Sequence, residues 1–146
     1  RQKVPVLAAY KETVLQNAAK GAYVLSPAQK EHRALTIIAT GSEVSLALGA
    51  QKKLAAMGLD AAVVYMPSWE VFEEQELRYK ESVLPAVPTF AVEAGVTLGW
   101  SRYTGSEKRV LGINTFGASA PGNIVMERYG MTVDCVVNMV KKELAK

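Results

Sequence analysis

The sequence has little of what many catalytic sites are built from. Its 146 residues include one cysteine, Cys135, and one histidine, His32. A single cysteine cannot form an internal disulfide, and one cysteine with one histidine cannot supply the paired ligands of a zinc site. Such sparing use of cysteine is typical of a reducing, cytoplasmic setting.

The sequence also lacks an excess of one charge and a long apolar run. The 17 basic and 14 acidic residues give a net charge of +3 and are spread along the chain. A nucleic-acid partner is not predicted, because such proteins gather basic residues in a patch or stripe. No apolar run approaches the roughly 18 residues of a membrane span, and the first residues lack the apolar centre of a signal peptide. We expect a soluble, unexported protein with no membrane partner.

The start of the chain predicts a piece of something longer. Residue 1 is Arg1 and not methionine, which indicates either a processed start or a cut piece, and we favour the cut piece. Residues 1–20 carry few large apolar side chains in a regular pattern and include Pro5, which favours a linker or the tail of a preceding domain. Residues 21–146 are long enough to form one domain with a real core.

From residue 21 onward, short apolar runs alternate with amphipathic ones. A strand, a helix and a strand in that order make a right-handed crossover between parallel strands. The pattern therefore predicts a three-layer α/β/α domain around a mostly parallel sheet of about five strands. Strands are expected at 21–25, 34–39, 61–65, 89–92 and 109–113, and helices at 42–57, 73–84, 98–103, 124–129 and 133–144.

The last of these helices is the best specified. Thr132 is a good N-cap, and Met131 and Val136 are placed to form a hydrophobic staple. The helix carries a stripe of apolar residues, and Lys141 and Lys142 near its end complement the helix dipole.

Residues 115–122, Thr-Phe-Gly-Ala-Ser-Ala-Pro-Gly, are expected to shape the backbone and not to carry out catalysis. Gly117 and Gly122 would permit dihedrals or close approaches that a Cβ forbids, and Pro121 suits the first turn of a helix.

Two serines are candidate nucleophiles. Neither Ser42 nor Ser119 lies in a Gly-x-Ser-x-Gly elbow, and His32 lies in a polar loop. A catalytic triad is not predicted, and both serines are expected to begin helices.

Two further polar features precede or follow strands. Thr40-Gly41-Ser42-Glu43 turns from a strand into a helix and so resembles an anion cradle, but Glu43 would itself occupy the positive end of the helix. Glu93 ends a strand at the carboxyl edge, where α/β proteins place ligands. We expect it to accept hydrogen bonds from amides of a neighbouring loop or to face another domain, and whether Ser42 or Glu93 contacts a ligand stays open.

The remaining conspicuous side chains have structural interpretations. Trp69 and Trp100 are expected in the core or an interface, and Cys135 lies off the main stripe of the last helix. Arg1 is a residue type that clamps phosphates, although a chain terminus holds it poorly.

Seven segments, taken in order along nearly the whole chain, resemble the C-terminal, third domain of transketolases. They are Gly-Ala-Tyr-Val-Leu (21–25), Ala-Thr-Gly-Ser-Glu-Val-Ser-Leu-Ala (39–47), Met-Pro-Ser (66–68), Glu-Ser-Val-Leu-Pro (81–85), Val-Glu-Ala-Gly (92–95), Thr-Phe-Gly-Ala-Ser-Ala-Pro-Gly (115–122) and Tyr-Gly-Met-Thr-Val-Asp (129–134).

The resemblance implies a fold and a setting. Transketolases move a two-carbon ketol unit between sugar phosphates in the pentose phosphate pathway, using thiamine diphosphate and a divalent cation such as Mg²⁺ held between two earlier domains of a homodimer. Their third domain has an α/β sheet whose first strand is antiparallel. It holds none of the thiamine chemistry, so this chain alone is expected to be inactive and to bind no cofactor.

The resemblance also implies one site residue. Arg1-Gln2 is similar to the end of the family's Ser-Arg-Gln segment, whose arginine binds the substrate phosphate from the end of the middle, pyrimidine-binding domain. Residues 1–20 would then join that domain to the domain at 21–146. Asn114, where relatives often have an acid, and Trp69-Glu70 after Pro-Ser depart from the pattern.

Two alternatives remain open from the sequence. The chain is also compatible with the C-terminal domain of a related thiamine enzyme, such as a dihydroxyacetone synthase or a ketoacid dehydrogenase component. A free-standing binding or dimerisation module of the same fold is the other possibility.

Overall fold

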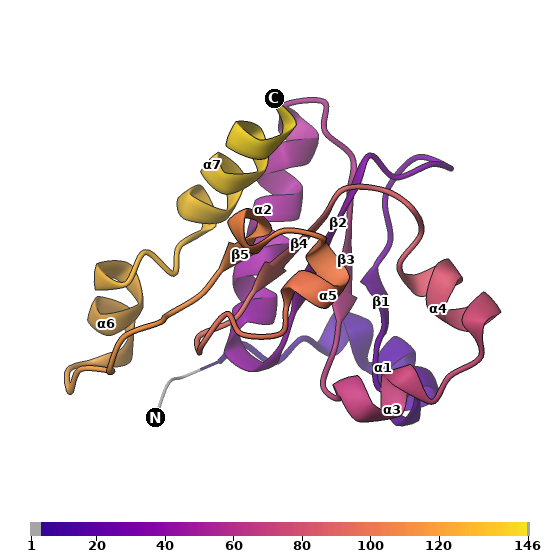
Figure 1. Cartoon of the computed structure of the whole chain (residues 1–146), viewed down its shortest axis with the longest axis horizontal. Coiled ribbons are helices and arrows are strands. Elements are labelled where there is room, and N and C mark those ends of the chain that lie inside the picture. The colour runs from indigo at the N-terminus through magenta and orange to yellow at the C-terminus, as the bar shows by residue number, and fades with distance from the viewer. Residues whose placement is uncertain (1–3, 146) are drawn as a thin grey trace.

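The computed structural model describes residues 4–145, which form one mixed sheet between two layers of helices (Figure 1). Five strands make up the sheet in the order β1-β3-β2-β4-β5. The strand β1 is antiparallel to β3, and the other neighbouring pairs are parallel. The strands are β1 (Tyr23–Ser26), β2 (Leu35–Ala39), β3 (Ala61–Tyr65), β4 (Thr89–Val92) and β5 (Val110–Leu111). The predicted architecture, including the antiparallel first strand, is confirmed.

Alternation of side chains along the central strands divides the core in two. Leu35 and Ile37 of β2 point to a cluster completed by α2 (Val44–Ala56) and α7 (Val133–Leu144). Ile38 points to the opposite cluster, which contains residues of three helices, α3 (Trp69–Glu73), α4 (Leu77–Val83) and α5 (Ser101–Thr104). Because both faces are covered, β2, β3 and β4 read as continuous apolar runs in the sequence.

The helix α7 begins where its sequence predicts. The Thr132 side chain accepts a hydrogen bond from the backbone N–H of Cys135 at 3.2 Å. Met131 and Val136 are both buried in the same core cluster, as a hydrophobic staple requires. Cap and staple together fix where α7 begins and the direction from which the chain enters it.

The helix predicted at 73–84 is wrong in its extent, because two helices replace it. Ser68 caps α3 by accepting from the N–H of Val71 at 3.2 Å, so helical structure begins at Trp69. The chain is then extended at Glu76 (φ −56°, ψ 145°) before α4 starts. This break allows both Phe72 and Val83 to reach the same core cluster.

Residues 8–20 are helical, which the sequence pattern did not predict. They form two 3₁₀ turns, Ala8–Tyr10 and Ala18–Lys20, on either side of α1 (Lys11–Asn17). Leu7, Tyr10 and Val14 pack against the core at helical spacing. That stripe is too sparse to stand out in the sequence, and the assignment of residues 1–20 to a preceding domain stays a prediction.

Candidate functional site

The carboxyl ends of β2 and β4 place Thr40 and Glu93 side by side. Parallel pairing aligns Ala39 with Val92, so the residues that follow each strand become neighbours. The Thr40 hydroxyl donates to the Glu93 carboxylate at 3.1 Å. Glu93 therefore has a partner in a neighbouring loop, as expected, but the donor is a side-chain hydroxyl and not a backbone amide.

A second carboxylate, Glu43, lies in the same region and was not predicted to be buried. A 3₁₀ turn, Gly41–Glu43, precedes α2 and leaves Glu43 only 3% exposed. The Ser42 hydroxyl donates a hydrogen bond to the Glu43 carboxylate. The one feature of the sequence that indicated burial of Glu43 was its position immediately before an apolar helix.

The two carboxylates make this edge unsuited to anions. Burial raises the pKa of Glu93, the Thr40 hydrogen bond lowers it, and the negative charge of Glu43 raises it again. A phosphate at Thr40–Glu43 would meet both negative charges. The structure therefore favours the simple strand-to-helix turn over the anion cradle.

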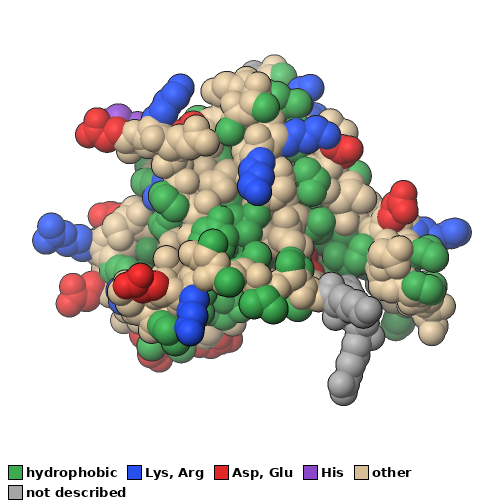
Figure 2. All heavy atoms as spheres, turned by 180° about the vertical axis from the view of Figure 1, so that it is seen from behind, with side chains coloured by type: hydrophobic (Ala, Val, Ile, Leu, Met, Phe, Trp, Pro, Cys, Tyr) green, Lys and Arg blue, Asp and Glu red, His purple; other side chains and the backbone are tan. Residues whose placement is uncertain are grey.

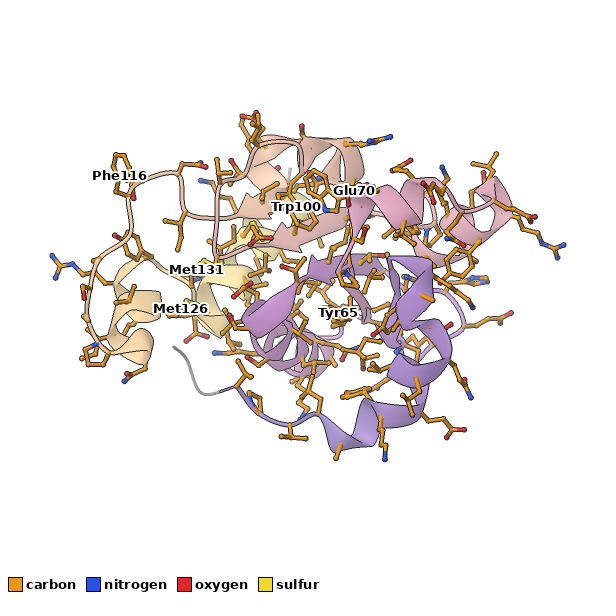
Figure 3. The ribbon with its side chains drawn as sticks, turned by 90° about the horizontal axis from the view of Figure 1, so that it is seen from below. Tyr65, Glu70, Trp100, Phe116, Met126 and Met131 are labelled. Atoms are coloured by element: carbon orange, nitrogen blue, oxygen red, sulfur yellow. The ribbon has the colours of Figure 1, made fainter. Side chains whose placement is uncertain are left out.

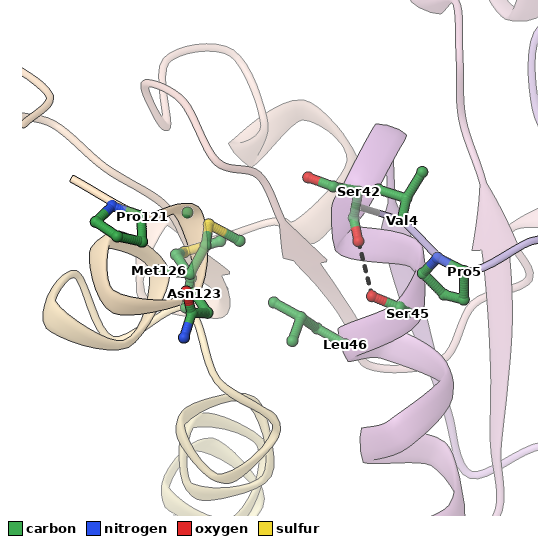
Figure 4. Close-up of a pocket in the computed structure, with 10 residues that line it drawn as sticks. Val4, Pro5, Ser42, Ser45, Leu46, Pro121, Asn123 and Met126 are labelled. Atoms are coloured by element: carbon green, nitrogen blue, oxygen red, sulfur yellow. Dashed lines mark hydrogen bonds between the residues drawn. The ribbon is translucent and has the colours of Figure 1, made fainter. Parts of the chain in front are cut away.

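A cavity of about 560 Å³ opens beside this edge, between α2 and α6 (Gly122–Arg128) (Figure 4). Its polar groups come from Ser42, Ser45 and Asn123, and the Ser45 hydroxyl donates to the Ser42 carbonyl at 2.9 Å. The rest of the lining is small or apolar: Val4, Pro5, Leu46, Pro121, Gly122, Met126 and Met131.

Within residues 4–145, His32 does not form a nucleophilic triad with Ser42 or Ser119. His32 precedes β2 and Ser42 follows it, so the two residues lie at opposite ends of that strand. Ser119 lies in the exposed loop before α6.

Neither serine begins a helix by capping it, contrary to prediction. The turn at Gly41–Glu43 has no side-chain cap, and Ser42 directs its hydroxyl to Glu43 instead. The residue that flanks α6 is Pro121, with φ −51° and ψ 133°, so Pro121 stands outside the first turn and Ser119 is further away.

Gly117 of the 115–122 run differs from prediction, and Gly122 does so in its φ. Neither Gly117 nor Gly122 adopts a positive φ, and a Cβ on Gly117 would meet no atom within 4 Å. The reason at Gly117 is that the loop is exposed there, with no atom close enough to contact a Cβ. A glycine just before this run, Gly112, does need its small size, because a Cβ there would lie 2.5 Å from Thr97 Cγ2 and 2.9 Å from the Gly95 carbonyl.

The other named residues have structural positions. Trp100 is buried and packs edge-to-face on Trp69 with ring centroids 4.8 Å apart, which confirms a core role. Cys135 is half-buried near the start of α7. Arg1 and Gln2 lie outside the described residues.

Residues 4–145 offer no group of three or more His, Cys, Asp or Glu side chains placed to hold a metal ion. Within the same residues, no helix is both long and apolar enough to cross a membrane.

Comparison with known proteins gives one consistent family. The model of the transketolase-like C-terminal domain matches residues 21–132. The transketolase of Geobacillus stearothermophilus is 49% identical over 148 residues, covering 100% of this chain and 22% of the relative. The transketolase of Streptococcus pyogenes is 47% identical over 143 residues, covering 97% of this chain and 20% of the relative.

Solved structures agree. The transketolase from Leishmania mexicana superposes with a TM-score of 0.80 at 39% identity, covering 88% of this chain and 18% of that one. The chain thus spans only about a fifth of the length of the curated relatives it matches. By family model, sequence identity and fold, the chain belongs to the transketolase family and corresponds to its C-terminal domain.

Proposed function

We propose that this chain serves as the C-terminal domain of a transketolase, which transfers a two-carbon ketol unit from a ketose phosphate to an aldose phosphate. The observation that carries the proposal is identity of 47–49% to two transketolases over essentially the whole chain. The full enzyme is proposed to be a cytoplasmic homodimer that uses thiamine diphosphate and Mg²⁺.

The residues of this domain do not fit the cofactor. A diphosphate at the carboxyl edge would face the carboxylates of Glu43 and Glu93, and a Mg²⁺ ion needs several oxygen ligands that residues 4–145 do not gather. We therefore assign thiamine diphosphate and Mg²⁺ to other parts of the full-length enzyme, and no catalytic step is assigned to this domain.

Calorimetry tests the cofactor assignment. We expect no heat of binding when the 146-residue chain is titrated with thiamine diphosphate in the presence of Mg²⁺. Saturable binding at micromolar concentrations would contradict it.

Steady-state kinetics test the role of Arg1 as the substrate-phosphate ligand. Replacing Arg1 by Leu in the full-length enzyme is expected to raise KM for sugar phosphates with a smaller change in kcat, because a bidentate phosphate contact is lost. Unchanged kinetics with phosphorylated substrates would remove Arg1 from the site.

A further inference from the structure

We propose that the open edge of the sheet, at β5, binds an extended acidic peptide segment as an additional parallel strand. The inference goes beyond the proposed function and does not rest on it. The binding surface, called the β5 groove below, is a cavity of about 470 Å³. Its lining comes from β5, from the 3₁₀ turn Glu107–Arg109 that precedes β5, and from the second half of α7.

The β5 groove lies along the edge of the sheet and not on one face. In the described sheet β5 is the last strand, and its hydrogen-bonded neighbour is β4 (Figure 1). Val110 packs against the core cluster that contains Trp100, whereas Leu111 packs against the cluster that contains Met131. Figure 3 shows Trp100 and Met131 apart from each other. Because Val110 and Leu111 point to opposite layers and both line the groove, the groove reaches around the strand edge between them.

Backbone polar groups at this edge point away from the sheet. The Glu93 N–H donates to the Leu111 carbonyl at 3.0 Å, so Leu111 directs its backbone groups toward β4. The backbone groups of a strand alternate in direction, so the Val110 carbonyl and the Gly112 N–H point to the open side. Neither of these two groups has a hydrogen bond to another of residues 4–145. They are available to a further strand.

The two unbonded groups have the spacing of a parallel ladder. In a parallel pair, one residue of the added strand donates its N–H to the Val110 carbonyl and accepts, at its own carbonyl, from the Gly112 N–H. An antiparallel partner of Val110 would need the Val110 N–H as well, but that group already donates to the Glu107 carbonyl. The edge therefore favours a strand parallel to β5.

The charges of the groove select an acidic segment. Lys108, in the turn before β5, and Lys142, on α7, both line the groove and are both exposed. Neither lysine forms an ion pair with another of residues 4–145. Glu143 also lines the groove, but it already has an interaction of its own. The two ammonium groups are therefore placed to attract carboxylates on either side of the added strand.

The same lysines disfavour a second copy of this chain as the occupant. Two copies paired edge to edge at β5 would bring their basic side chains together, and lysine at an edge strand is a common protection against such pairing. The attraction is also local. Figure 2 shows the lysine and arginine side chains of the face seen there spread singly and not gathered into a patch.

A synthetic peptide tests the proposal on the full-length polypeptide that carries this chain. The probe is a fluorescein-labelled peptide of four alternating glutamate and valine pairs, and its binding is followed by fluorescence anisotropy. We expect saturable binding, about tenfold tighter than that of the same peptide with lysine in place of glutamate. Equal affinity for the two peptides, or no saturable binding of the acidic one, overturns the proposal.

Hydrogen exchange at Gly112 tests whether the peptide adds as a strand. The Gly112 N–H should exchange freely in the protein without peptide and about tenfold more slowly with the acidic peptide bound, because it then donates to a peptide carbonyl. Protection of Gly112 before the peptide is added would show that the edge is already covered. An unchanged exchange rate with the peptide bound would place the peptide elsewhere. Either result contradicts a strand added at β5.

A matched pair of charge reversals provides the third measurement. Lys142→Glu is expected to weaken binding of the acidic peptide about fivefold and to strengthen binding of the lysine peptide, because an attraction becomes a repulsion. A gain for the lysine peptide cannot come from misfolding. Lys11 is exposed on α1, which contacts β1 at the other edge of the sheet, so Lys11→Glu should change neither affinity by more than about twofold. Equal effects of the two reversals would refute the β5 groove as the site.

Discussion

Two glycines with nearly equal φ angles give the sharpest prediction about the fold. Gly21 has φ +79° and Gly58 has φ +81°, so an alanine at either position adopts a left-handed conformation. Their surroundings differ completely. A Cβ on Gly58 would meet nothing within 4 Å, whereas a Cβ on Gly21 would lie 2.3 Å from the backbone nitrogen of Phe72 and 2.7 Å from the carbonyl of Ser68.

The magnitudes follow from these contacts. The left-handed conformation costs an alanine about 1–2 kcal/mol, offset in part by about 0.4–1 kcal/mol from a less flexible unfolded chain, so Gly58→Ala should lose about 1 kcal/mol. Gly21, with ψ −33°, lies outside the left-handed helical region, so Gly21→Ala incurs at least this cost and must also displace the backbone of α3, which cannot relax by changing a rotamer. Overpacking of this kind costs about 1–3 kcal/mol or more, so we expect a total loss of about 3–4 kcal/mol.

Urea and thermal unfolding followed by far-ultraviolet circular dichroism measure both variants. At roughly 4 °C per kcal/mol for a domain of this size, Gly58→Ala should lower Tm by about 4 °C and Gly21→Ala by about 12 °C or more. The hydrogen bond from the Ser68 N–H to the Gly21 carbonyl, at 3.1 Å, should also weaken in Gly21→Ala. Losses within about 1 kcal/mol of each other would refute the reasoning, because the contacts around Gly21 would then have no energetic weight.

Three other changes have defined outcomes. The pKa of Glu93 is raised in the folded chain, so ionising its carboxyl group lowers the stability of the fold as pH rises from the unfolded pKa through the folded one. Glu93→Gln should therefore unfold at a higher Tm than the parent at pH 8 and at the same Tm at pH 3. A larger gain in Tm at pH 3 than at pH 8 would contradict a raised pKa of Glu93. Thr132→Ala should lose about 1 kcal/mol in urea unfolding, since the cap on the Cys135 N–H is removed, and an unchanged midpoint would exclude the cap. Ser119→Ala should leave kcat for ketol transfer unchanged in the full-length enzyme, whereas a hundredfold loss would make Ser119 catalytic.

The sheet was predictable because its physical signals are local. Strands buried on both faces, such as Leu35–Ala39, need continuous apolar runs, and α7 carries its own cap and staple in neighbouring residues. The helix break at Glu76 was not visible, because it is set by two side chains, Phe72 and Val83, reaching one core cluster from separate helices.

The sequence drew attention to the residues of the candidate site separately, but not to their proximity. Glu93 was placed at the carboxyl edge from its position after a strand. Its partners, Thr40 and Glu43, lie about fifty residues earlier in the chain, and their proximity depends on the pairing of β2 with β4. For the 115–122 run the prediction was wrong. Its small residues indicated a tightly packed backbone, but the structure shows an exposed loop whose conspicuous feature is the exposed Phe116 side chain.

The role of this chain within a transketolase is tested most directly by a ketol-transfer assay. The full-length polypeptide and the 146-residue chain are each supplied with thiamine diphosphate, Mg²⁺, a ketose phosphate donor and an aldose phosphate acceptor. We expect turnover by the full-length polypeptide and none by the chain alone. Turnover by the chain alone, or a folded full-length polypeptide without ketol transfer, would contradict it.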